Sequence, residues 1–115
     1  MGAFGLTLSS LVANAAQRHQ LRKAELAPGD RLFVVTANST YSIHVLDEGT
    51  CIVSGGWFDR KGLSPARTRI IGCTWGGSAV KIDVAAACGL RLEFGNRLVT
   101  TPVQKILVLR HACEN

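Results

Sequence analysis

The chain has 115 residues, of which 47% are hydrophobic and 18% are charged, and 13 Lys and Arg against 8 Asp and Glu give a formal net charge of +5. This composition excludes an intrinsically disordered chain, and 12 Gly with only 3 Pro exclude a collagen-like or low-complexity protein. The length predicts a single domain over residues 1–115.

The first predicted element is an N-terminal helix over residues 6–24. Apolar residues recur there with the spacing of one helical face: Leu8, Leu11, Val12, Ala15 and Ala16. Arg22 and Lys23 fall in the predicted last turn, where they complement the helix dipole. A secretion signal requires a Lys or Arg before its apolar segment, and none precedes the apolar residues here. No stretch reaches the ~18 apolar residues of a membrane span. We therefore expect no membrane association and a cytoplasmic location.

Residues 30–110 are predicted to form an all-β barrel or sandwich of about eight short, mainly antiparallel strands. The predicted strands are Arg31–Ala37, Ser39–Leu46, Thr50–Ser54, Ala66–Cys73, Ala79–Val84, Gly89–Phe94, Arg97–Thr101 and Val103–Arg110. A loop is predicted from Gly55 to Pro65, and the small residues Val84–Cys88 are interpreted as a crossing between strands.

The four cysteines, Cys51, Cys73, Cys88 and Cys113, show neither a compact disulfide framework nor zinc-knuckle spacing. The first three lie in apolar or Gly-rich stretches, which favours reduced, structural thiols in a reducing cytoplasm. His44 and Cys51 flank a predicted hairpin, but nothing nearby would activate the thiol, so a buried Cys and a surface His are preferred. No spacing points to a metal site or a cofactor.

The segment after the third predicted strand is a candidate nucleic-acid surface. It places two aromatic residues beside two cations, with two arginines further along: Trp57, Phe58, Arg60, Lys61, Arg67 and Arg69. Aromatic rings stack on bases and cations contact phosphates. The competing interpretation is that Trp57 and Phe58 plug one end of the barrel while Arg60 and Lys61 are solvated.

A Gly-rich turn over residues 72–78 is a candidate small-ligand or enzymatic site. Its candidate ligand-binding residues are Thr74, Trp75, Ser78 and Lys81. Glycines allow backbone N–H groups to converge on an anion, but the spacing of a P-loop is not present, and a strand turn explains the same glycines.

Short, mostly turn-forming motifs spread over residues 29–109, about 70% of the chain, carry a resemblance to known proteins. They are Gly29-Asp30-Arg31, Asn38-Ser39-Thr40-Tyr41, Gly55-Gly56, Gly76-Gly77-Ser78, Gly89-Leu90-Arg91-Leu92 and Thr101-Pro102-Val103. In these the chain resembles a group of small, uncharacterised bacterial β-rich proteins with no assigned activity. The resemblance implies a bacterial, β-rich domain and supplies no catalytic residue.

Together these patterns predict a non-enzymatic binding or assembly module. The charged fraction is low for a soluble domain, which leaves apolar surface and favours a homo-oligomer. The alternatives are a nucleic-acid-binding barrel that uses the aromatic and basic segment, and a small-ligand or enzymatic site at residues 72–78.

Overall fold

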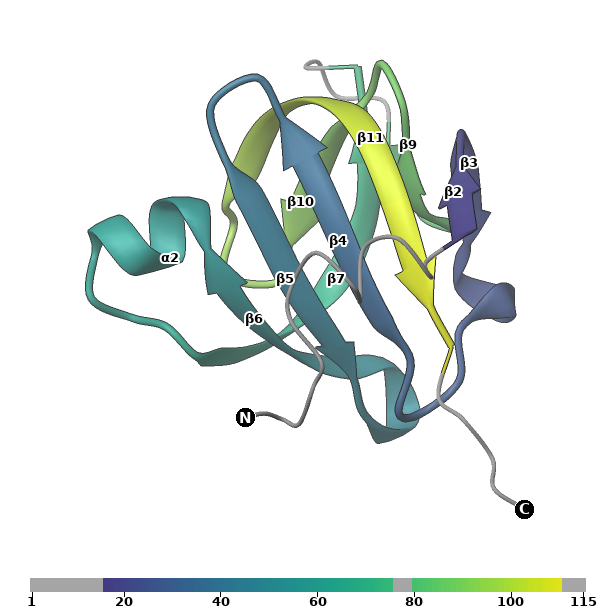
Figure 1. Ribbon diagram of the computed structural model, residues 1–115, viewed down its shortest axis with the longest axis horizontal. Helices are drawn as coiled ribbons and strands as arrows, with labels where there is room; N and C mark the ends of the chain where they lie inside the picture. The colour runs from purple at the N-terminus through teal and green to yellow at the C-terminus, as the bar shows by residue number, and fades with distance from the viewer. Residues whose placement is uncertain (1–15, 76–79, 111–115) are drawn as a thin grey trace, which may run out of the picture.

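The structure is a computed structural model and describes residues 16–75 and 80–110. Six antiparallel strands form a closed barrel in the order β10-β11-β4-β5-β6-β7, and β7 pairs back to β10 (Figure 1). Their bounds are β4 Arg31–Thr36, β5 Thr40–Val45, β6 Thr50–Gly55, β7 Ala66–Thr74, β10 Arg91–Phe94 and β11 Val99–Leu109. The all-β prediction is confirmed, and the barrel rather than the sandwich is the form adopted.

The remaining elements surround this barrel. The strands are β2 Ala16–Arg18, β3 Gln20–Arg22, β8 Val80–Lys81 and β9 Val84–Ala87, and the helical turns are η1 Lys23–Glu25, η2 Asp47–Gly49 and α2 Gly56–Arg60. Strand β2 pairs with β11, β8 pairs with β7, and β3 and β9 form a separate two-stranded sheet. In Figure 1, α2 and η2 lie beyond opposite ends of β6.

Alternation along the strands builds the core. In β5, Tyr41, Ile43 and Val45 are buried, whereas Ser42 and His44 between them are half-buried on the outer face. A period of two residues puts one set inside a barrel and the other outside. The interior therefore follows from the sequence pattern of these strands.

The predicted helix over 6–24 is wrong from Ala16 onward. Residues 16–22 form β2 and β3, and Leu21 is buried between exposed Gln20 and Arg22, as in a strand. The apolar helical spacing ends at Ala16, and pairing with β11 and β9 outweighs the helix propensity of residues 17–22. Residues 6–15 of the predicted helix lie outside the described residues.

Other boundaries also differ from prediction. The predicted strands on either side of Pro102 form the single strand β11. Up to Pro102 the assigned pairs of β11 include β10, and from Val103 onward they are with β4. Proline has no backbone N–H to donate, and the change of partner at this residue accommodates it. The predicted crossing at 84–88 is the buried strand β9, whose alanines pack against β3 and β7. The predicted loop after β6 begins with the helical turn α2.

Candidate functional site

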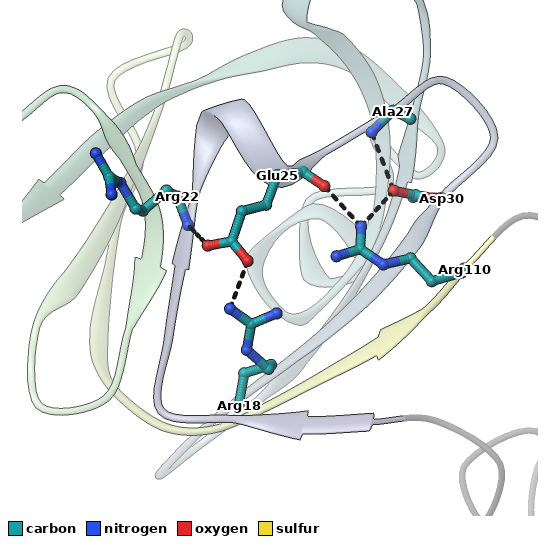
Figure 2. Close-up of polar contacts among 6 residues, drawn as sticks. All are labelled: Arg18, Arg22, Glu25, Ala27, Asp30 and Arg110. Atoms are coloured by element: carbon teal, nitrogen blue, oxygen red, sulfur yellow. Dashed lines mark hydrogen bonds and ion pairs between the residues drawn. The ribbon is translucent and has the colours of Figure 1, made fainter.

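The segment between β3 and β4 crosses one end of the barrel, and a network of charged groups holds it there (Figure 2). We call this segment, residues 23–30, the η1 arm. The Glu25 carboxylate accepts hydrogen bonds from the Arg18 guanidinium and from the backbone N–H of Arg22, 3.0 Å away. The Arg18 hydrogen bond is the larger cause, and the Arg22 hydrogen bond the next, of a lowered pKa for Glu25.

The far end of the η1 arm is fixed by Arg110, the residue that follows the last strand, β11. Arg110 Nη1 donates to the Asp30 carboxylate at 2.7 Å and to the Glu25 carbonyl oxygen at 2.7 Å. The same Asp30 oxygen accepts from the N–H of Ala27 at 3.0 Å, and the Asp30 side chain is only 4% exposed. Arg18 and Arg110, which are far apart in the sequence, thus both bind the η1 arm, as Figure 2 shows.

Between the η1 arm and the barrel lies a cleft of about 250 Å³, which we call the arm cleft. It lies where β5 ends and β6 begins. Its lining residues are Lys23, Leu26, Pro28, Val45, Leu46, Glu48, Gly49, Thr50, Cys51, Arg69 and Ile70. The mouth of a β-barrel is a common position for a small-molecule site.

Two cations reach the arm cleft from elements far apart in sequence. Lys23 Nζ donates to the carbonyl oxygen of Ile71 at 2.8 Å, and Arg69 Nη2 donates to the carbonyl oxygen of Glu48 at 3.0 Å. An ammonium has three donors and a guanidinium five, so both groups retain the capacity to bind an anion. With Glu48, the lining residues that the structure describes carry two positive charges and one negative charge.

The thiol in the wall of the arm cleft is poorly suited to nucleophilic chemistry. Burial raises the pKa of Cys51 to about 11, although the nearby Arg69 acts in the opposite direction. His44 pairs with Ile52 and lies on the outer face of β5, away from the buried Cys51. Burial also raises the pKa of Cys73 to about 11. The preferred interpretation of a buried Cys51 and an outward His44 therefore holds.

A smaller cleft of about 130 Å³ lies at the opposite end of β5, beside α2, and we call it the α2 cleft. Its lining residues are Asn38, Ser39, Tyr41, Trp57, Arg60, Leu98, Val99, Thr100 and Thr101. Arg60 Nη1 donates to Ser39 Oγ at 3.2 Å, which joins α2 to the turn between β4 and β5.

Two glycines set the position of α2. A Cβ on Gly55 would lie 2.2 Å from the carbonyl oxygen of Thr40, and one on Gly56 would lie 2.6 Å from the ring of Tyr41. Gly55 also has a φ of 101°, which side chains disfavour. Below α2, the Phe58 ring is fully buried, with its centroid 5.5 Å from that of Phe94. The glycines thus allow α2 to close this end of the barrel.

The candidate nucleic-acid residues do not form one surface. Phe58 is wrong as a base-stacking residue because it is 0% exposed, and the plug interpretation describes it correctly. Trp57 and Arg60 line the α2 cleft, and Lys61 is exposed just after α2. Arg69 lines the arm cleft, and Arg67 is exposed on β7, outside the lining of either cleft.

The candidate site at the Gly-rich turn is described only in part. Thr74 is buried, which removes it from a surface site, whereas Trp75 is 61% exposed with Lys81 Nζ 5.2 Å from its ring centroid. Ser78 lies outside the described residues. Neither the arm cleft nor the α2 cleft is lined by Thr74, Trp75 or Lys81.

Sequence reasoning missed the arm cleft. Lys23 was expected to complement a helix dipole, so it was not linked to Arg69. The only local signal was the strand-like alternation around Leu21, which would have replaced the end of the predicted helix with an extended segment.

Comparison of the chain with protein-family models, with curated proteins and with solved structures gave no match. The resemblance to small bacterial proteins therefore stays a prediction. Over the residues that the structure describes, no helix has the length and apolar character needed to cross a membrane.

Proposed function

We propose that the protein is a non-enzymatic binding module that takes a small amphiphilic anion, such as a short-chain carboxylate, in the arm cleft. The observation that carries the proposal is the convergence of Lys23 and Arg69 on a cleft otherwise lined largely by apolar side chains. A few well-placed polar groups in an apolar lining are what fixes the orientation of a small ligand.

The lining suggests how such a ligand would lie. A carboxylate would meet the Arg69 guanidinium, whose planar fork suits two parallel hydrogen bonds, and the Lys23 ammonium. The apolar part would contact Leu26, Val45 and Ile70. A lining with one net positive charge favours a monoanion over a dianion.

The test is a titration of the whole chain with a series of carboxylates from butyrate to octanoate and with the matching alcohols. Calorimetry gives the affinity, and amide shifts of Leu46 and Ile70 in NMR spectra locate the ligand. We expect the carboxylates to bind more tightly than the alcohols, and Arg69→Met and Lys23→Met to weaken binding about tenfold.

Arg67→Met is the matched control, because Arg67 lies on the same strand and face as Arg69 but outside the lining of the arm cleft. Equal losses in Arg67→Met and Arg69→Met would show that the anion is attracted by the general positive charge. If the alcohols bind as tightly as the carboxylates, Lys23 and Arg69 do not contribute to the affinity, and the proposed anion site is wrong.

Self-association is a second proposal, favoured by two apolar side chains at the strand pair β7–β8. Trp75 is 61% exposed and Ile82 is 66% exposed. If a second copy covers them, light scattering over a concentration series will show a dimer or larger oligomer that Trp75→Ser and Ile82→Ser weaken. Leu63→Ser, which changes an exposed residue outside the strands, is the control and should leave the oligomer intact.

We also propose that the protein works in a reducing compartment such as the cytoplasm. Cys51, Cys73 and Cys88 are free thiols, and the first two are buried in the core. Free, buried thiols are typical of proteins that need no disulfide for stability.

A further inference from the structure

The α2 cleft brings together three segments that are separate in the sequence. Ser39 comes from the turn between β4 and β5, Trp57 and Arg60 come from α2, and Thr101 comes from the first half of β11. The cleft therefore combines an indole ring, a guanidinium and neutral hydrogen-bonding groups in one small space.

The aromatic side of the cleft is held rigidly. The Trp57 ring meets Phe58 edge to face, with ring centroids 5.3 Å apart, and Phe58 is anchored in the core. Trp57 itself is half-buried and lines the cleft. A fixed aromatic ring that borders a cleft is a platform for stacking a planar ring.

The charged side of the cleft is basic. Arg60 is exposed and is oriented by its hydrogen bond to Ser39. Two more cations are exposed nearby: Lys61 follows Arg60, and Arg97 precedes Leu98 of the cleft lining. The nearby Asp59 carboxylate accepts from the N–H of Gly55 at 3.1 Å. No carboxylate is among the described lining residues, so the site favours an anion over a neutral sugar.

The size and the remaining polar groups limit the ligand further. A volume of about 130 Å³ corresponds to roughly four water molecules at ~30 Å³ each, which suits one planar ring. Thr100 is already used, since its hydroxyl donates to the Thr101 carbonyl and accepts from the N–H of Leu92. Asn38 and Thr101 are the polar side chains that can meet the edge of a ring.

We propose that the α2 cleft binds one unpaired, pyrimidine-sized base of a single-stranded nucleic acid, with the base stacked on Trp57 and the adjoining phosphate on Arg60. This site is separate from the arm cleft, and the proposal does not depend on the carboxylate proposal. Neutral hydrogen bonds at the base edge would give a modest sequence preference, and most of the affinity would come from stacking and phosphate contact.

The test uses Trp75→Phe as the background, which leaves Trp57 as the single tryptophan of the chain. Its fluorescence is followed during titration with an eight-residue oligothymidylate at ~50 mM salt, where contacts to phosphates are strongest. We expect quenching, and we expect Arg60→Gln to weaken binding about tenfold and to reduce the salt slope by about 1.

Arg67→Gln is the matched control, since it removes an exposed arginine outside the lining of this cleft and should change the affinity less than twofold. Unchanged Trp57 fluorescence, or equal losses in Arg60→Gln and Arg67→Gln, would overturn the proposal. Thymidine monophosphate is expected to bind more weakly than the oligomer. Equal binding would show that the ligand of the cleft is a free nucleotide and not a strand. Equal quenching by a neutral disaccharide would make this a sugar site instead.

Discussion

The two clefts lie at opposite ends of β5, and we call these the arm end and the α2 end of the barrel. The outer wall of the arm cleft is the η1 arm, which lies outside the barrel, whereas the outer wall of the α2 cleft is formed by segments that connect barrel strands. The η1 arm is held by charges, through Arg18, Glu25, Asp30 and Arg110. Helix α2 is held by close packing. Gly55 and Gly56 allow close approach to Thr40 and Tyr41, and the Phe58 ring is buried below them.

This difference shows that one barrel can carry two kinds of cleft. A wall held by ion pairs sits over an apolar lining with two cations, which suits an amphiphilic anion. A wall held by steric fit presents an aromatic ring and an arginine, which suits a planar anionic ligand. Changes of charge should therefore disturb the arm end, and changes of volume should disturb the α2 end.

The largest effect is expected for Gly55→Ala at the α2 end. The new Cβ would lie 2.2 Å from the Thr40 carbonyl oxygen at a φ of 101°, so the backbone must shift. We expect a loss of about 3 kcal/mol in the free energy of unfolding, measured by urea denaturation.

Gly62→Ala is the control for this substitution. Gly62 also has a positive φ, of 70°, but a Cβ there meets nothing within 4 Å, so a cost of only about 1 kcal/mol is expected. If the two variants lose the same stability, close contact does not position α2, and the contrast between the two ends fails.

A smaller effect is expected for Asp30→Ala at the arm end. The change removes the acceptor of Arg110 Nη1 and of the Ala27 N–H. Because the carboxylate is buried while Arg110 can turn to solvent, we expect a loss of about 2 kcal/mol, measured by the same denaturation.

The Asp30→Ala variant should also weaken carboxylate binding in the arm cleft and leave Trp57 quenching by oligothymidylate unchanged. Asp83→Ala, which removes an exposed carboxylate, is the control and should change stability by less than about 0.5 kcal/mol. Loss of both binding activities would mean that the two ends are coupled rather than independent.

The smallest effect is expected for Glu25→Gln, and it should depend on pH. The Glu25 pKa is lower in the folded protein than its usual value of 4.5, so the ionised group stabilises the fold at neutral pH. This contribution is present above the unfolded pKa and is lost as pH falls through the folded pKa. The stability difference between wild type and variant, measured by urea denaturation across a pH series, should therefore be present at pH 7 and vanish in acid.

High salt provides the control for Glu25→Gln, because exposed ion pairs are screened. The difference at pH 7 should shrink in ~1 M NaCl. If the stability difference persists unchanged in acid, the amide of the Glu25→Gln variant destabilises the protein through its packing and not through the lost charge. The arm end would then resemble the α2 end, where packing matters most.

The strands of the barrel could be predicted from local patterns. Alternation in Ser39–Leu46 predicted β5, with Tyr41, Ile43 and Val45 buried, to within a residue at each end. The break predicted at Pro102 was wrong because the cost of a missing N–H depends on whether a partner strand needs it there. The strand character of residues 16–22 was missed because their partners, β11 and β9, lie far along the chain.

The candidate sites were predicted less well, for the same reason. Trp57 and Arg60 were grouped correctly because they are three residues apart on one turn, but nothing local showed that Ser39 and Thr101 would meet them. Phe58 was misassigned since only the packing against Tyr41 and Phe94 decides which of two adjacent aromatic residues is buried.

The sequence by itself determined the all-β class, most strand positions and the inward side of each strand, because a period of two residues is a local property of the chain. Only the tertiary structure decided that the strands close into a barrel, that Lys23 and Arg69 line the same cleft, and that Arg60 donates to Ser39. The residues in each of these pairs are at least 21 positions apart, and barrel closure brings them together, so no short stretch of sequence contains both members of a pair.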